Sequence, residues 1–282
     1  MATGFFTDTT LCIGCKACEV ACKQWNELPS DGFTFTGNSY DNTSELSGTT
    51  WRHVAFVEQT TQTNEGIENR WLMSSDVCKH CTNAGCLEAC PTGAIIRNEF
   101  DSVFIQPDVC NGCGYCVVSC PFGVVDLIAK FDPEGSHYNV ASLQEERREE
   151  HQTALQNDGG VAGKCTLCYD RQKIGFVPAC AKACPTESIQ FGDIDELRER
   201  ARARVDILTQ RGVPAQLYGA DDVGGGVGPL NAFFLLTDRP EVYNLPAQPV
   251  LPSTRQPAGY TAAAVAAVGL AIAGWMIFRN DS

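Results

Sequence analysis

The sequence predicts an α+β fold in which small cysteine-bearing units come first and one membrane helix comes last. Three observations support this prediction. Sixteen cysteines fall into four groups of four, and none lies outside a group. In three groups the last cysteine precedes a proline, a turn and a short run with β-branched residues, which predicts a strand. Near the end of the chain, residues 258–278 carry no charged side chain.

The four groups follow one another along the chain. They are Cys12, Cys15, Cys18 and Cys22; Cys78, Cys81, Cys86 and Cys90; Cys110, Cys113, Cys116 and Cys120; and Cys165, Cys168, Cys180 and Cys184. Groups one and three have the spacing C-x2-C-x2-C-x3-C. With this spacing, three cysteines wrap a loop around one cubic iron–sulfur cluster while the fourth points toward a second cluster. Groups two and four have longer gaps but still supply four thiolates each.

The cysteine count matches four 4Fe-4S clusters, since four thiolates hold each cluster and no histidine or aspartate ligand is needed. Zinc sites use two C-x2-C pairs and need no third cysteine at this spacing. A membrane-tethered, zinc-binding structural protein therefore stays open as the weaker alternative. A disulfide framework is not expected, because such chains are small and secreted and the N-terminal residues show no signal peptide.

The segments between the groups predict further elements. A proline cannot continue a helix, so the fourth cysteine of groups two, three and four should end a short helical turn. Cluster loop, short helix and strand form the ferredoxin pattern. In the insertion 24–77 we expect strands at Trp51–Glu58 and Arg70–Met73. Residues 132–160 are polar and predict a solvated helix and loop, and residues 193–211 predict an amphipathic helix.

The C-terminal part predicts a membrane attachment. Residues 224–228 read as a flexible glycine run, and the proline-rich residues 229–257 as an extended arm. As a helix, residues 258–278 span about 31 Å at 1.5 Å per residue, close to the ~30 Å hydrocarbon core of a bilayer. Tyr260 and Trp275 lie near its ends, where interfacial aromatic residues are common. A buried core helix is the alternative.

Charge and motifs narrow the function further. The net charge of −13 excludes nucleic acid as a partner, because its binders carry basic patches. We find no nucleophile motif, dinucleotide fingerprint or P-loop, so catalysis is expected on another chain. His80 reads as a loop residue or a donor that tunes a cluster. The lysines beside cysteines are either cationic donors near sulfur or plain surface residues; they are Lys16, Lys23, Lys79 and Lys164.

Two stretches carry a family resemblance: FFTDTTLCIGCKACEVACKQWNEL at 5–28 and KCTLCYDRQKIGFVPACAKACPTESIQFG at 164–192. They resemble the iron–sulfur (beta) subunit of membrane-bound respiratory molybdenum or tungsten formate dehydrogenases, as do CNGCGYCVVSCPFG and NAFFLLTDRPEVYNLP. Beta subunits of nitrate, dimethyl sulfoxide and polysulfide reductases and of some hydrogenases share the four-cluster pattern. The sequence CIGCKACEVACKQWN in the first group favours formate dehydrogenase.

The resemblance implies two interleaved ferredoxin-like modules, each holding two 4Fe-4S clusters. Group one would pair with group four, and group two with group three. The first set would be Cys12, Cys15, Cys18 and Cys184; the second Cys22, Cys165, Cys168 and Cys180; the third Cys78, Cys81, Cys86 and Cys120; the fourth Cys90, Cys110, Cys113 and Cys116. That the last cysteine crosses to another cluster supports this scheme without choosing the pairing.

The implied domains follow from that pairing. One module covers 1–77 and 160–192, and the other 78–131. A polar insertion occupies 132–159. The helix and the proline-rich arm cover 193–257, and the transmembrane helix covers 258–278.

The resemblance also implies an electron route. A catalytic alpha subunit with molybdopterin and molybdenum or tungsten would supply electrons, and a membrane cytochrome b gamma subunit and quinone would accept them. The chain would cross the cytoplasmic (inner) membrane once, in contact with the lipid bilayer, with its cluster domain on the outer, periplasmic side. The alternative is the beta subunit of another molybdopterin oxidoreductase or of a hydrogenase.

Overall fold

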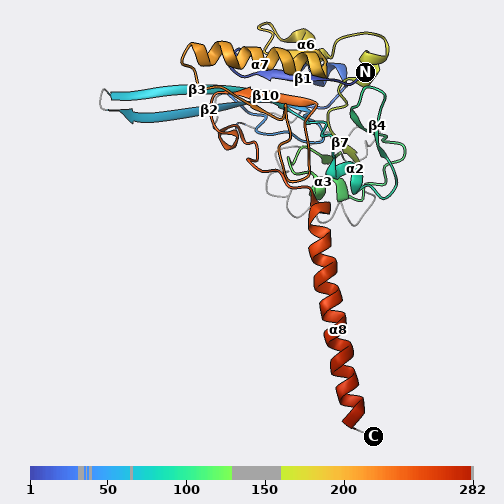
Figure 1. The fold of residues 1–282 in the computed structure, drawn as a ribbon. Helices are drawn as coiled ribbons and strands as arrows, with labels where there is room; N and C mark the ends of the chain where they lie inside the picture. Colours follow the sequence, from blue (N-terminus) through green and yellow to red (C-terminus); the bar gives the residue numbers. More distant parts are fainter. Residues whose placement is uncertain (31–34, 36, 38–39, 64–65, 129–159, 281–282) are drawn as a thin grey trace.

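A four-stranded sheet lies at the centre of the computed structural model, which describes residues 1–30, 35, 37, 40–63, 66–128 and 160–280. Its strand order is β8-β1-β10-β9 (Figure 1). The strands are β1 (Thr3–Asp8), β8 (Ile189–Asp193), β9 (Gln216–Tyr218) and β10 (Ala232–Leu236). β1 pairs antiparallel with β8 and parallel with β10. The start of the chain is thus a central strand.

The two central strands are apolar on both faces because both faces are covered. Helix α7 (Ile194–Gln210) lies along one face (Figure 1), where Phe6, Phe233 and Leu235 pack against it. The other face presents Phe5, Phe234 and Leu236 to the cysteine-bearing loops. The sheet therefore gives the cysteine loops a rigid apolar floor.

The predicted amphipathic helix is confirmed as α7. The Asp193 carboxylate caps its first turn by accepting hydrogen bonds from the backbone N–H groups of Asp195 (3.0 Å) and Glu196 (3.2 Å). Leu197, Ala201 and Leu208 are buried on its inner face, as the periodicity predicts.

The predicted extended arm over residues 229–257 is wrong in its first part. Residues 232–236 form β10, which is fully buried in the sheet. Pro229 and Pro240 lie just outside the apolar run AFFLL, so they bound the strand without interrupting it. Two short 3-10 helices follow, η2 (Pro240–Tyr243) and η3 (Pro252–Arg255).

The glycine run is not a free linker either. Gly225 has a φ of 59°, and a Cβ there would lie 1.9 Å from the Pro249 carbonyl oxygen. The Leu251 N–H donates to the Gly225 carbonyl at 2.9 Å. Glycine is thus needed where two backbone segments touch.

The cysteine loops contain the short elements that the sequence predicts. Helices α3 (Tyr115–Ser119) and α6 (Ala179–Ala183) end directly before the fourth cysteine of their groups, and α2 (Gly85–Glu88) ends two residues before its own. Strands β4 (Ile95–Arg97), β6 (Asp126–Ile128) and β8 follow the three Cys-Pro pairs. The remaining short elements are α1 (Ala17–Trp25), α5 (Tyr169–Lys173), β5 (Val103–Ile105), paired with β4, and β7 (Val161–Gly163), paired with β6.

A long hairpin extends sideways from the body (Figure 1). Its strands are β2 (Arg52–Thr63) and β3 (Gly66–Val77), paired antiparallel over their full length. Both predicted strands of the 24–77 insertion are confirmed inside this hairpin, except that Trp51 lies just before β2, and both strands continue beyond their predicted ends. Its inner end is buried, whereas residues 66–71 are exposed.

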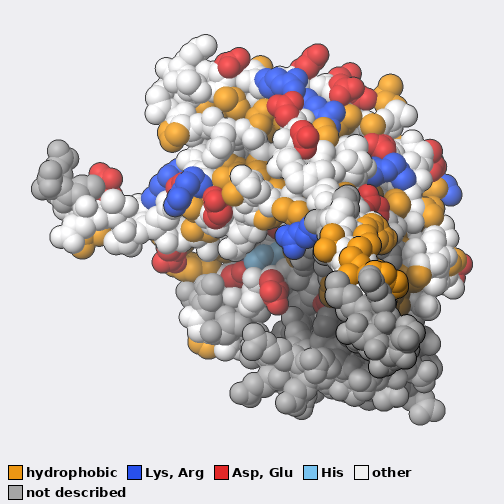
Figure 2. Space-filling model, turned by 60° about the horizontal axis from the view of Figure 1, so that its bottom comes forward, with side chains coloured by type: hydrophobic (Ala, Val, Ile, Leu, Met, Phe, Trp, Pro, Cys, Tyr) orange, Lys and Arg blue, Asp and Glu red, His pale blue; other side chains and the backbone are white. Residues whose placement is uncertain are grey.

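Helix α8 (Gln256–Asn280) projects from the body as a single rod (Figure 1). Across the described ranges, none of the helices combines the length and hydrophobicity that crossing a bilayer demands. The predicted transmembrane helix over 258–278 is therefore not confirmed. On the face drawn in Figure 2, charged side chains of both signs are interspersed over the body. The predicted helix and loop of 132–160 lie outside the described residues, apart from residue 160.

Candidate iron–sulfur sites

The first cavity is lined by thiols from two distant parts of the chain. Cys12 and Cys15 come from the loop after β1, and Cys18 lies on α1. Cys184, at the end of α6, completes the lining. The space between these residues is about 290 Å³, and part of it is open to solvent. These four residues are the first set implied by the resemblance.

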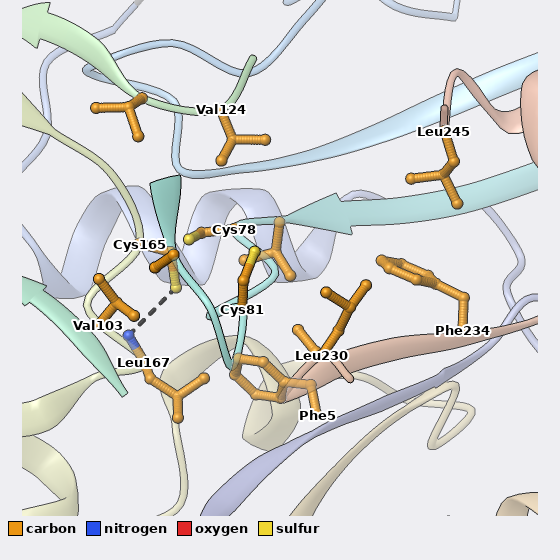
Figure 3. Close-up of a cluster of buried hydrophobic side chains, with 14 of the residues drawn as sticks. Phe5, Cys78, Cys81, Val103, Val124, Cys165, Leu167, Leu230, Phe234 and Leu245 are labelled. Atoms are coloured by element: carbon orange, nitrogen blue, oxygen red, sulfur yellow. Dashed lines mark hydrogen bonds between the residues drawn. The ribbon is translucent and has the colours of Figure 1, made fainter. Parts of the chain in front are cut away.

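A second cavity, of about 300 Å³, gathers the third set. Cys78 and Cys81 lie in the loop after β3, Cys86 lies on α2, and Cys120 ends α3. The walls are otherwise largely apolar, including Val103. Figure 3 shows Cys78 and Cys81 among the buried hydrophobic side chains. Cys78, Cys81 and Cys86 are buried, whereas Cys120 is partly exposed.

The other two sets are recognised by the charges that act on their thiols. Burial raises the pKa of Cys165 well above its ordinary value, and neighbouring thiolates of Cys22, Cys168 and Cys180 raise it further. Burial likewise raises the pKa of Cys116 to about 11, with contributions from Cys110, Cys113 and Cys90. The thiols of the second set thus act on one another electrostatically, as do those of the fourth set, and Cys78 of the third set also acts on Cys165.

Helix packing explains why cysteines far apart in sequence meet. α1 packs against α6, and α2 packs against α3. α1 carries Cys18 and Cys22, whereas Cys180 lies on α6 and Cys184 ends it. Groups one and four therefore meet in one place, and groups two and three in another.

Neighbouring sets also act on each other. Burial is the main cause of the raised pKa of Cys18, and the charge of Cys180 in the second set raises it further. That of Cys165 is raised by Cys78 of the third set, which lies close to it in Figure 3. That of Cys86 is raised by Cys116 of the fourth set. These electrostatic effects link the sets in the order first, second, third, fourth, and we call this series the row of sets.

Several thiol sulfurs already accept hydrogen bonds. Backbone N–H groups donate to Cys165 Sγ from Leu167 (3.3 Å, Figure 3) and to Cys110 Sγ from Ala162 (3.4 Å). Ser75 Oγ lies 3.3 Å from Cys18 Sγ. Donors to sulfur stabilise the thiolate form that binds metal and tune a cluster's potential.

Among the described residues, the cations that are 2% exposed or less and lie among the cysteine sets are Arg52, Lys79 and Lys164. Lys79 donates to the Asp76 carboxylate and to the Val77 carbonyl. Lys164 donates to the carbonyls of Val103 and Cys165. The sequence pattern singled out both lysines because they adjoin cysteines. It missed Arg52, which lies 26 residues from the nearest cysteine in sequence; its only signal was its place at the start of a predicted strand.

His80 also lies inside the protein, in the wall of the third-set cavity. Its Nδ1 accepts a hydrogen bond from the Val103 N–H at 3.2 Å. Burial lowers the pKa of the imidazole well below its ordinary value, and the Lys164 charge lowers it further. His80 is thus a neutral loop residue beside a complete set of four thiols.

The donors present fit iron–sulfur clusters. Both cavities are lined by four sulfurs, and thiolate is the usual ligand of iron–sulfur clusters. Four sulfurs around one zinc ion would sit only about 2.3 Å from it. Within the described ranges, no three thiol, imidazole or carboxylate groups converge tightly enough to hold one ion. The enclosed spaces suit a larger group of atoms.

A row of four thiol sets on a ferredoxin-like scaffold defines an iron–sulfur protein of the electron-transfer class. Two family descriptions match, each a 4Fe-4S dicluster domain, one over residues 69–133 and 151–194 and the other over residues 11–94. The zinc alternative is therefore wrong: the protein is built for 4Fe-4S clusters.

Curated relatives narrow the class. The protein is 38% identical over 247 residues to the formate dehydrogenase iron–sulfur subunit of Haemophilus influenzae, covering 86% of its own length and 68% of the relative. It is 39% identical to the nitrate-inducible formate dehydrogenase iron–sulfur subunit of Escherichia coli K12, and the match covers 86% of its own length and 71% of the relative. The B subunit of the E. coli anaerobic dimethyl sulfoxide reductase is 32% identical, covering 70% and 76%. The protein belongs to the family of formate dehydrogenase iron–sulfur subunits.

Proposed function

We propose that the protein relays electrons from a formate-oxidising molybdopterin subunit through four 4Fe-4S clusters to a membrane cytochrome b subunit. The row of four cysteine sets supports this proposal most directly, because each set contributes charge to the next. When bound, such clusters take up and release single electrons. The higher identity to formate dehydrogenase subunits than to the dimethyl sulfoxide reductase subunit favours formate as the donor.

We assign the ligands set by set, as named above. The first and third sets are supported by their shared cavities, and the second and fourth by their mutual electrostatic effects. The first and second sets would form the module of 1–77 and 160–192, and the other two the module of 78–131. The protein's own contribution is to hold the thiolates, exclude water and donate hydrogen bonds to sulfur.

Exposed apolar side chains lie near both ends of the row. Cys15 of the first set is exposed and is flanked by the exposed side chains of Ile13 and Val20. At the other end, Tyr115 and Val118 of α3 are exposed next to the fourth set. α3 lies near the base of α8 (Figure 1). We propose that electrons enter at the first set and leave at the fourth, on the side of α8.

We also propose that residues 258–278 attach the protein to the inner membrane as a single-pass helix, with the cluster domain on the periplasmic side. The uncharged sequence supports this, and so does the exposure of Val265, Leu270 and Trp275 on α8. Figure 2 shows hydrophobic side chains gathered where α8 comes toward the viewer, next to atoms drawn in grey. Contacts with lipid and with a cytochrome b subunit would cover these side chains.

Purification of the complex under anaerobic conditions tests the proposal. We expect about sixteen irons per polypeptide, four for each cysteine set. Formate should bleach the broad visible absorbance of the clusters, and a molybdopterin subunit should co-purify. Reduced clusters that are oxidised by dimethyl sulfoxide but never reduced by formate would instead assign the protein to a reductase. Little iron or acid-labile sulfide would refute the cluster assignment.

A further inference from the structure

Arg52 is a buried cation with unused hydrogen-bond donors. It opens β2, and only 1% of its surface is exposed. Its Nη1 donates to the Ser75 carbonyl (3.3 Å) and to Ser75 Oγ (3.0 Å), and its guanidinium lies 4.7 Å from the Phe5 ring centre. Among the described residues, Nε and Nη2 have no partner. A buried guanidinium without an anion is costly, so its position calls for negative charge.

The neighbours of Arg52 are the thiols of two sets. Ser75, which Arg52 contacts, lies 3.3 Å from Cys18 Sγ of the first set. The thiolates whose charges act most strongly on Arg52 are Cys180, Cys18, Cys165 and Cys22. One belongs to the first set and three to the second. Arg52 therefore lies at the junction between the first two sites.

We propose that Arg52 is a positioning residue that bridges the first and second 4Fe-4S sites. With clusters bound, its Nε–H and Nη2–H groups, which have no partner among the described residues, would donate to sulfur of these sites, and its charge would offset their negative charge. The inference rests on the proposed function. Each site gains one further negative charge when it accepts an electron, so a nearby fixed cation favours the reduced form and raises the potential. Arginine keeps its proton throughout, so the charge is constant.

Lys164 provides the comparison, because it occupies the next junction. Lys164 is 2% exposed. Burial lowers its pKa, and the charges that raise it come from Cys78, Cys86, Cys165 and Cys120. These thiols belong to the second and third sets. Two carbonyls accept hydrogen bonds from its ammonium group. Its removal should therefore act on the second and third sites and leave the first unchanged.

The experiment is a redox titration of the whole complex, followed by paramagnetic resonance, with iron content measured in parallel. In Arg52→Met we expect the equilibrium constant for one-electron reduction of the first and second sites to fall about tenfold, which is about 59 mV. Arg52→Lys should restore part of this loss, because it keeps the charge but not the planar donors. The third and fourth sites should be unchanged. Lys164→Met is the matched control.

Three results would overturn the inference. The first is full iron content with unchanged potentials in Arg52→Met. The second is an equal shift at all four sites, which would mean a general charge effect. The third is loss of iron in both Arg52→Met and Arg52→Lys, which would make Arg52 a folding residue. Absence of cluster signals from the wild-type complex would refute the proposed function itself, so the two failures are distinct.

Discussion

Several residues beside the cysteines adopt backbone angles that side chains normally avoid. Lys16, His80, Leu167 and Cys168 all have φ between 45° and 57°. Left-handed conformations are uncommon outside glycine and are retained where the surroundings demand them. Here they fall in the loops that carry the cysteines, so the tightest turns of the backbone lie in the cysteine-bearing segments.

Replacing Cys184 tests whether the last cysteine of group four serves the first set. It ends α6 and lines the cavity with Cys12, Cys15 and Cys18. In Cys184→Ala we expect the resonance signal of the first site to be lost or altered and the iron content to fall, with the third and fourth signals intact. A loss confined to the second site, which groups Cys165, Cys168 and Cys180, would contradict the assignment.

Gly4 in β1 faces a close backbone contact, and its loss should destabilise the sheet. A Cβ at Gly4 would lie 2.1 Å from the Asn231 carbonyl oxygen and 2.5 Å from Ile194 Cδ1. Gly4→Ala should therefore cost roughly 1–3 kcal/mol, as overpacking of a core does. Its partner across the ladder, Gly192, has nothing within 4 Å of such an atom. Gly192→Ala should change stability by less than about 0.5 kcal/mol.

Thermal loss of the visible cluster absorbance measures both glycine variants in the same way. Each kcal/mol should lower Tm by roughly 2–4 °C in a protein of this size. Equal Tm values for Gly4→Ala and Gly192→Ala would show that β1 and β10 can separate without cost.

Among the elements, the β2–β3 hairpin is anchored by Asp238, which follows β10. Its carboxylate accepts hydrogen bonds from Gln59 Nε2 (3.1 Å) and Arg70 Nη1 (3.3 Å). The Arg239 backbone N–H lowers the pKa of Asp238, and the bond from Gln59 lowers it further. A lowered carboxyl pKa means that the anchoring is complete above the ordinary value of about 3.9 and is lost as the pH falls through the folded value.

Asp238→Asn should therefore speed amide hydrogen exchange in the hairpin near Gln59 and Arg70 at neutral pH. The variant should also lack the acid-induced loosening that we expect of the wild type below about pH 4. Glu68→Gln is the control, because Glu68 is exposed on the same hairpin. Equal exchange rates in all three proteins would mean that other contacts hold the hairpin.

Elements with a local signal could be predicted from the sequence. The helix α7 follows from its apolar spacing and its Asp193 cap, and the strands after Cys-Pro follow from their β-branched residues. β10 could not be predicted. The nearby prolines in the sequence indicated an extended arm, whereas the strand is formed by pairing with β1, more than 220 residues earlier. Arg52 was missed for the same reason: its neighbours are far away in sequence. The spacing of cysteines along the sequence therefore predicts the candidate cluster ligands, whereas the residues that surround them depend on contacts between distant segments.

On the scale of the whole molecule, α8 is separate from the cluster-bearing body, and it contacts η3 at its base. A protein truncated at Pro257 should therefore keep its clusters and become soluble without detergent. Iron content and partitioning between membrane and soluble fractions measure this. Unchanged membrane association of the truncated protein would assign the attachment to another subunit, and loss of iron would show that α8 supports the body.

The central position of β1 constrains the time at which the protein can assemble. β1 pairs with β8 and β10, so its hydrogen bonds on both sides wait for residues 189–193 and 232–236 to leave the ribosome. Cys12, Cys15 and Cys18 would meanwhile be accessible thiols on a nascent polypeptide, without the fourth ligand Cys184. Cluster delivery to the first site would consequently have to wait until Cys184 has left the ribosome.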